Sequence, residues 1–218
     1  MLGLVTLGHT PRPDFERVFR RYAGDTEICI RGALDGLSPD EARRLADPDD
    51  SYPLLVRLSD GTSAEVPLQK LVPRVGACAR SLASDGARLV VVLCAGEFPQ
   101  IDCPRPVLLP GRLVPGVVSA LTRSRRIGVV TPVRRQVEAA RLKWTADGFD
   151  AVVHWASPVE PGEMDAAARV MADPSLECVV LDCMGHDEDY RREFARRCGR
   201  PVVLAQSIVA RIAGELVS

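Results

Sequence analysis

One stretch, Val179-Val180-Leu181-Asp182-Cys183-Met184-Gly185-His186, joins three apolar residues to a cysteine that a glycine follows two residues later. A second stretch, Leu89-Val90-Val91-Val92-Leu93-Cys94-Ala95-Gly96-Glu97, repeats this pattern. Continuous apolar residues are typical of strands that are covered on both faces of a parallel sheet. Ligands of open parallel sheets bind beyond the carboxyl ends of the strands. We therefore expect Cys94 and Cys183 to end core strands beside one shared cleft.

Further apolar runs of the same kind occupy residues 2–7, 127–130, 151–153 and 202–204. The segments between the runs carry apolar residues at helical spacing, as in the set Phe15, Val18, Phe19 and Tyr22. Regular alternation of strands and helices is typical of parallel sheets. The sequence therefore predicts an α/β protein.

The chain repeats this organisation without repeating its sequence. An opening strand ends in Thr6 or Thr131, helices follow, and a later strand ends in a cysteine. We therefore expect two pseudo-symmetric lobes, each a mainly parallel sheet flanked by helices. The proline-rich segment 104–115 is the candidate crossing between them. The predicted lobes span residues 1–112 and 113–205, and a C-terminal helix over 206–218 is expected to pack back on the first.

Residues 54–66 depart from the pattern because two short runs flank Asp60-Gly61, a dipeptide that favours a tight turn. They predict a β-hairpin inserted in the first lobe. The next segment has one apolar helical face, and we expect a helix that enters through Pro67 and is kinked or started at Pro73.

Helix ends are also marked in the sequence. Ser38-Pro39-Asp40-Glu41 combines a cap, a proline at the first helical position and a glutamate three residues after the cap, which predicts a helix start. Gly148 and Gly199 stand where helices are expected to stop.

Composition narrows the class of protein. The formal net charge of −1 gives no basic field that would attract nucleic acid or an anionic membrane. Residues 1–7 lack the features of a signal peptide, and no apolar run approaches the roughly 20 residues that span a bilayer. Seven cysteines without close pairs fit reduced thiols. We expect a cytoplasmic protein with neither nucleic-acid nor membrane partners.

Glycine after each strand-end cysteine would let the backbone approach a ligand closely, and amides at the next helix start would favour a thiolate. The alternative for any cysteine is a small buried hydrophobic residue. We assign that interpretation to four cysteines and regard Cys103 as a loop thiol. The four are Cys29, Cys78, Cys178 and Cys198.

Three segments resemble the AroM family: residues 4–8, residues 181–186 and residues 201–213. The similarity runs nearly end to end, and the C-terminal third is most specific. That family is similar in turn to the aspartate/glutamate/hydantoin racemase superfamily, whose members have two pseudo-symmetric α/β lobes. The resemblance implies that Cys94 and Cys183 flank a substrate carbon as acid and base, without pyridoxal phosphate, any other cofactor or a metal.

The resemblance also implies a substrate site at the strand ends. Thr6 and Thr131 match positions where the superfamily binds a substrate carboxylate or carbonyl, although both could instead cap the following helices. Gly8 would leave room beside Thr6. The complete candidate set for substrate binding is Thr6, Gly8, His9, Gly96, Thr131, Pro132, Gly185 and His186. The two histidines could assist proton transfer or simply be exposed loop residues.

The cysteine segments depart from the amino-acid racemases. Those enzymes follow their cysteines with Asn-Thr and Thr-His, whereas Ala95-Gly96 and Met184-Gly185 stand here. The second pair is closer to hydantoin racemases. We expect a racemase or isomerase of a small amino acid, hydantoin or related carboxylate or carbonyl compound. The alternatives are a single-cysteine decarboxylase or isomerase and a non-catalytic metabolite-binding or regulatory protein.

The sequence gives less support to a nucleotide site, a metal site or further substrate contacts. No glycine-rich nucleotide fingerprint follows a strand, and cysteines and histidines are scattered rather than grouped at metal-ligand spacing. Asp182 could orient a partner or cap a helix, and Ser207 is another natural cap. Arg134 and Arg135 could meet an anionic substrate or form a solvated helix face. The sequence is compatible with a homodimer.

Overall fold

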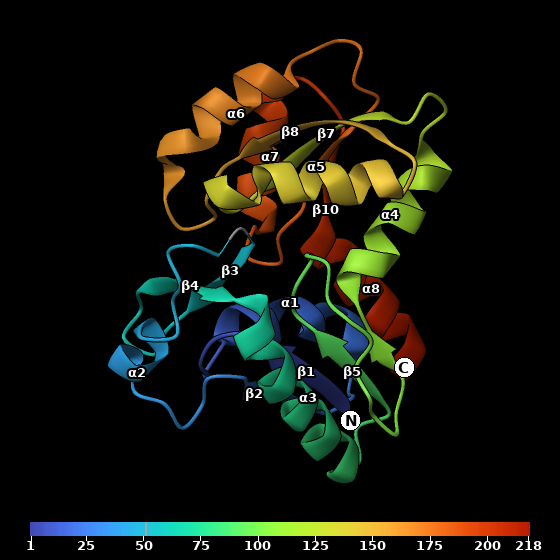
Figure 1. The fold of residues 1–218 in the computed structure, drawn as a ribbon. Helices are drawn as coiled ribbons and strands as arrows, with labels where there is room; N and C mark the ends of the chain where they lie inside the picture. Colours follow the sequence, from blue (N-terminus) through green and yellow to red (C-terminus); the bar gives the residue numbers. More distant parts are fainter. Residues whose placement is uncertain (51) are drawn as a thin grey trace. The chain divides into compact units, whose positions relative to one another are not determined.

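Two parallel sheets of four strands each organise the chain, as the apolar runs predict (Figure 1). The structure is a computed structural model that describes residues 1–50 and 52–218. The chain divides into two units: unit 1 contains Met1–Cys94, Phe98–Pro110 and Val209–Ser218, and unit 2 contains Ala95–Glu97 and Gly111–Ile208.

The two sheets share one topology. The first sheet has the order β2-β1-β5-β6, with strands β1 (Leu2–Thr6), β2 (Ile28–Gly32), β5 (Leu89–Val92) and β6 (Val107–Leu108). The second has the order β10-β9-β7-β8, with strands β7 (Arg126–Thr131), β8 (Asp150–Trp155), β9 (Val179–Leu181) and β10 (Val202–Leu204). Numbered within each unit and without the hairpin, both sheets read 2-1-3-4. The prediction of two pseudo-symmetric parallel sheets is confirmed.

Helices flank both sheets, as expected. Unit 1 contains α1 (Pro13–Ala23), α2 (Pro39–Arg43) and α3 (Leu68–Ser84). Unit 2 contains α5 (Val137–Ala146), α6 (Met164–Met171), α7 (Glu188–Cys198) and the 3-10 turns η1 (Arg134–Gln136) and η2 (Pro161–Glu163). Two helices, α4 (Pro110–Leu121) and α8 (Ala205–Val217), begin in one unit and end in the other.

Strand side chains alternate between the two faces of each sheet, so their contacts show which helices cover which face. In unit 1, Val5 and Val92 share a core cluster with Leu71, Val75 and Leu82 of α3. In unit 2, α6 and α7 cover the face that carries Val130 and Leu181, and α5 lies across the other face (Figure 1).

The antiparallel hairpin lies in the first lobe, as predicted. Strands β3 (Pro53–Arg57) and β4 (Ser63–Pro67) pair from Pro53 opposite Pro67 to Arg57 opposite Ser63. Gly61 in the connecting turn has φ of 83°, a value that side chains disfavour, so the Asp60-Gly61 signal is physically justified.

The predicted helix ends are also confirmed. Ser38 and Glu41 form a reciprocal capping box at the start of α2. Gly199 ends α7 with φ of 65°, and Gly148 follows α5 with φ of 86°. Both glycines adopt the left-handed backbone that ends helices.

Segment 104–115 contains the passage of the chain from unit 1 to unit 2, between Pro110 and Gly111, as expected. It also contains β6 and the first half of α4, because prolines are tolerated in the first turns of a helix and at short edge strands. Helix α3 is entered through Pro67 and begins at Leu68, as expected, and it runs through Pro73 instead of starting there. Ser207 is not a cap: α8 begins at Ala205, and the Ser207 hydroxyl donates to Leu204 O at 3.1 Å.

Across the described parts of the chain, helices that combine the length and the apolar character needed to cross a membrane are absent.

The end of α8 is tied to unit 1. Thr26 Oγ1 and a guanidinium nitrogen of Arg88 both donate to Val217 O, each at 3.1 Å. The Arg211 guanidinium lies 4.9 Å from the ring centroid of Tyr22 in α1. Gly214 allows this close packing, since a Cβ atom there would lie 2.4 Å from Tyr22 O.

Two helix-interior glycines therefore give opposite predictions. Gly214→Ala should destabilise the protein by about 1–3 kcal/mol, because a methyl group must displace backbone. Gly116→Ala in α4 should stabilise it by up to about 1 kcal/mol, because alanine favours helix and a Cβ there meets nothing within 4 Å. Urea denaturation measures both. Equal effects of the two substitutions would contradict the described packing of α8.

Candidate functional site

The predicted threonines and cysteines occupy equivalent positions in the two units. Leu93 N donates to Val5 O at 2.8 Å, and Cys94 is the next residue. Asp182 N donates to Val130 O at 2.9 Å, and Cys183 follows in the same way. Each accepting carbonyl belongs to the residue before a threonine. The first and third strands of each sheet thus bring one threonine and one cysteine to the same edge.

A further pair of backbone bonds extends the equivalence. Ala33 N donates to Thr6 O, and Ala156 N donates to Thr131 O, both at 2.9 Å. In a sheet of order 2-1-3-4, chain connections diverge between the first and third strands, and ligands bind at such switch points. Each unit therefore places its threonine and its cysteine at the position where this fold class binds ligands.

Cys94 is the more buried of the two cysteines. Its exposed fraction is 7%, and it belongs to the hydrophobic core cluster of unit 1. Cys183 is half-buried and lies outside the core cluster of unit 2. The two strand-end thiols therefore share a position in the fold but differ in solvent access.

Thr6 has a cationic neighbour. Its hydroxyl accepts from a terminal guanidinium nitrogen of Arg12 at 3.1 Å. Arg12 is 11% exposed, lies 4.0 Å over the ring of Phe15 and pairs with Asp14 at 2.6 Å. Burial raises the pKa of Asp14, but hydrogen bonds and charge from Arg12 outweigh it, and the net pKa lies below the ordinary value. Arg12, and not Thr6, occupies the N-cap position of α1.

His9 and Gly8 serve the packing of unit 1. His9 is 5% exposed, its Nε2 lies 2.9 Å from Leu37 O, and its Nδ1 accepts from Ser59 N at 3.3 Å. A Cβ atom on Gly8 would lie 2.0 Å from Arg57 O. The alternative of an exposed loop histidine is therefore wrong for His9, and the space beside Gly8 is filled by the hairpin backbone.

Cys183 receives a backbone hydrogen bond. Gly185 N donates to Cys183 Sγ at 3.3 Å. A Cβ atom on Gly185 would lie 3.1 Å from Pro158 and 3.5 Å from Cys183 Sγ. A backbone N–H aimed at sulfur stabilises the thiolate form, and the glycine keeps the surroundings of the sulfur open.

His186 and Tyr190 form a buried aromatic pair beside this loop, with ring centroids 4.4 Å apart. His186 is fully buried, which excludes the exposed-loop alternative, and burial lowers its pKa to about 4. Burial, followed by the charge of Cys183, raises the pKa of Tyr190 to about 12. His186 Nε2 lies 3.1 Å from Ala156 O. In the described part of the chain, His186 Nδ1 and the Tyr190 hydroxyl are buried without a hydrogen-bond partner.

The other unit 2 candidates are held by internal contacts. The Thr131 hydroxyl donates to Gln136 Oε1 at 2.6 Å, while Val133 holds the N-cap position of η1. Pro132 is buried, and Arg134 and Arg135 are exposed. Buried Gln206 donates from Nε2 to Met184 O at 2.8 Å. These contacts fix the segments that follow β7 and β9.

Asp182 lies in a buried ionic cluster and does not cap α7, whose N-cap is Asp187. Asp182 Oδ2 accepts from Trp144 Nε1 at 2.9 Å and from Lys143 Nζ at 3.2 Å. The side chains of Lys143 and Asp182 are 7% and 4% exposed.

Lys143 Nζ also donates to Ala95 O at 2.9 Å. Gly96, the next residue, approaches α4 so closely that a Cβ on Gly111 would lie 2.2 Å from Gly96 O.

Three of the five remaining cysteines have environments that the structure describes in detail. Burial, followed by the charge of Glu177, raises the pKa of Cys178 to about 11. Burial and Asp35 raise the pKa of Cys78. The Cys103 thiol donates to Ala79 O at 3.6 Å. None of these thiols is favoured as a nucleophile.

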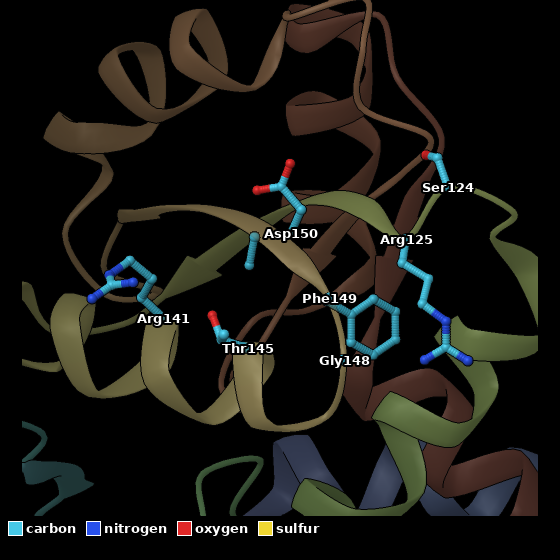
Figure 2. A pocket seen from close by; sticks show the side chains of 8 residues that line it. Ser124, Arg125, Arg141, Thr145, Gly148, Phe149 and Asp150 are labelled. Carbon is cyan, nitrogen blue, oxygen red and sulfur yellow. The ribbon is translucent and has the colours of Figure 1, made fainter.

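Residues 1–50 and 52–218 contain no group of three or more metal-ligating His, Cys, Asp or Glu side chains. An open pocket of about 590 Å³ lies in unit 2 at the amino ends of β7 and β8. Figure 2 shows Arg125 and Phe149 in its lining, with the guanidinium 5.5 Å from the ring centroid. This pocket is at the opposite ends of the strands from Cys183, so it is not the candidate site.

Sequence reasoning missed three residues near the cysteines and threonines: Arg12, Lys143 and Tyr190. Two carried a usable signal. Arg12 lies between two prolines shortly after the first strand, and Lys143 is one of only two lysines among 28 basic residues. Tyr190 lies in a helix dominated by charged residues and had no comparable signal.

Solved structures with the same fold include several enzymes. A mutant of arylmalonate decarboxylase in its liganded form has a TM-score of 0.67 and 15% identity, covering 100% of this chain and 92% of that one. Glutamate racemase from Aquifex pyrophilus has a TM-score of 0.62 and 15% identity, with coverages of 100% and 84%. Maleate isomerase Iso from Pseudomonas putida S16 has a TM-score of 0.62 and 12% identity, with coverages of 96% and 88%.

These structural similarities establish a common fold. None of the curated proteins compared with the sequence matches it significantly. The family model described as AroM protein matches residues 2–217, which is nearly the whole chain. The chain belongs to the AroM family.

Proposed function

We propose that this protein is a cofactor-independent racemase or isomerase of a small amino acid, hydantoin or related carboxylate, with Cys94 and Cys183 as its acid/base pair. The observation that carries the proposal is the equivalent placement of the two cysteines at the switch points of two sheets with one topology. Structures of the same fold include glutamate racemase, allantoin racemase and maleate isomerase.

The proposed reaction needs one base and one acid on opposite faces of a carbon. One thiolate removes the α-proton and becomes a thiol, the electron pair passes into an enolate, and the opposite thiol protonates the other face and becomes a thiolate. Gly185 N–H favours the thiolate of Cys183. Arg12 beside Thr6 offers a cation for a substrate carboxylate.

One observation favours a second candidate, a single-thiol decarboxylase or isomerase that relies on Cys183. Cys94 is only 7% exposed and packs among core residues, whereas Cys183 is half-buried. In that mechanism Cys183 protonates or attacks the substrate, and Cys94 only fills the core.

The test of the proposal is solvent deuterium incorporation at the α-carbon across amino acids, hydantoins and 2-aryl acids. Cys94→Ser and Cys183→Ser should each reduce the exchange rate at least about 100-fold, because a serine hydroxyl is a far weaker acid than a thiol and stays protonated at neutral pH, so it supplies no base. Cys103→Ser is the matched control: its hydroxyl can still donate to Ala79 O, so its rate should remain that of the wild type.

Exchange that survives both strand-end substitutions rules out thiol chemistry. Loss in Cys183→Ser alone identifies the single-thiol mechanism. Thermal stabilisation by one of the compounds without exchange or turnover identifies a binding protein instead, because a ligand of the native state stabilises it.

His186 contributes to this site as a neutral imidazole. Its pKa of about 4 means that it carries no charge at neutral pH. His186 therefore supplies no positive charge that would stabilise a thiolate. Its ring packs against the ring of Tyr190.

This burial makes stability depend on pH. The unfolded chain protonates His186 near its ordinary pKa of 6.5, so stability is lost as pH falls from 6.5 toward 4. The loss from this residue is about 3 kcal/mol. His186→Gln keeps a donor for Ala156 O without the titration, and its free energy of unfolding should fall less over this range. Identical curves for His186→Gln and wild type would contradict the assignment.

A further inference from the structure

A buried lysine in unit 2 joins the segments that adjoin the two strand-end cysteines. Lys143 Nζ donates to the carbonyl of Ala95, the residue after Cys94, at 2.9 Å. It also pairs at 3.2 Å with the carboxylate of Asp182, the residue before Cys183. Ala95, Lys143 and Asp182 all belong to unit 2, although Cys94 belongs to unit 1.

The pair is costly for a fold to retain. Lys143 and Asp182 are 7% and 4% exposed, and desolvating two charges takes back much of their attraction. Asp182 Oδ1 is buried without a hydrogen-bond partner among the described residues, which adds to the cost.

The fold does not need a charge at this position. Asp182 and Leu93 are equivalent, because each donates its backbone N–H to the carbonyl before the threonine of its unit. Unit 1 fills the position with an apolar residue that is 5% exposed. Leucine is thus sufficient for the backbone pairing and packing at this position. The presence of an ion pair at the same position in unit 2 needs a different explanation.

Geometry supplies that reason. Trp144 Nε1 fixes the same carboxylate oxygen at 2.9 Å, so the acceptor for Lys143 is held in place. Lys143 Nζ lies 5.2 Å from the ring centroid of Trp144, and a second N–H of its ammonium group donates to Ala95 O. Gly96 O in the same segment lies against the backbone of Gly111 in α4. The peptide after Cys94 is therefore held from α5 and from α4.

We propose that Lys143 and Asp182 are positioning residues that hold the peptide following Cys94 on unit 2. Lysine suits this role because a compact ammonium can serve two acceptors in different directions, and the chain otherwise uses arginine almost throughout. That this contact places Cys94 for proton transfer rests on the proposed function. That Lys143 and Asp182 hold the peptide in place does not depend on the proposed function.

The double variant Lys143→Met/Asp182→Leu tests the proposal. It removes both charges together, so no buried charge is left unpaired, and it installs the residue that unit 1 has at the equivalent position. Hydrogen–deuterium exchange read by mass spectrometry should accelerate about tenfold at the amides of residues 95–97. The amides of β7 should keep their wild-type rates.

Two further variants complete the design. Lys70→Met is the matched control, since Lys70 is the other lysine and donates to Leu45 O at 2.9 Å from an exposed site; it should leave residues 95–97 unchanged. Asp182→Asn keeps the side-chain shape and the acceptor for Trp144 but removes the charge that orients Lys143. It should accelerate exchange at residues 95–97 in the same direction by a smaller factor.

Catalysis separates positioning from simple structural support. In the proton-exchange reaction, the double variant should lose about tenfold in kcat with little change in KM, because a proton-transfer group is displaced while substrate-binding groups remain. Faster amide exchange with unchanged kcat would overturn the positioning role.

A folded double variant whose residues 95–97 keep their wild-type exchange rates would overturn the proposal, whatever the wild type catalyses. A wild type without proton exchange would overturn the proposed function, and the amide exchange rates would still decide whether Lys143 and Asp182 hold the peptide.

Discussion

Parallel pairing between the first and third strands of each sheet is the constraint on which the candidate site depends. The pairing ends with a backbone hydrogen bond to Val5 O in unit 1 and to Val130 O in unit 2. Because the register is the same in both, a threonine and a cysteine reach equivalent edges of the two sheets. A slip of one residue would turn each of these side chains to the other face.

The two units use this common frame differently. Unit 1 surrounds its cysteine with apolar residues and places a partly buried arginine beside its threonine. Unit 2 leaves its cysteine half-buried, gives it a backbone N–H, and has an ion pair at the preceding residue, Asp182. The two thiols therefore lie in different environments, and the environment of a thiol sets which protonation state it favours.

Much of the fold could be predicted from the sequence because its signals are local. Continuous apolar runs gave the buried strands, Asp60-Gly61 gave the hairpin turn, and Ser38 with Glu41 gave a helix start. Strands β2 and β6 were missed because one is only half-buried and the other has two residues. The crossing within segment 104–115 was predicted, but β6 and the start of α4 were not, because prolines mark both crossings and the first turns of helices.

The site was predictable only in part. The strand-end positions of Cys94 and Cys183 follow from the apolar runs, and their equivalence follows from the repeated topology. The partners of these residues are set by tertiary contacts: Lys143 lies 39 positions from Asp182, and the burial of His9 depends on the hairpin backbone. No local pattern carries such information, so the histidines were wrongly allowed as exposed loop residues.

The proposal that both strand-end thiols act on one carbon is tested most directly by cross-linking. A short bifunctional thiol reagent, applied to the folded protein and followed by peptide mass spectrometry, should join Cys94 to Cys183, because acid and base must each approach the same carbon to about 3–3.5 Å. Prior addition of a bound substrate should block the reaction. Separate single adducts on the two cysteines, with no cross-linked peptide under any condition, would contradict the account.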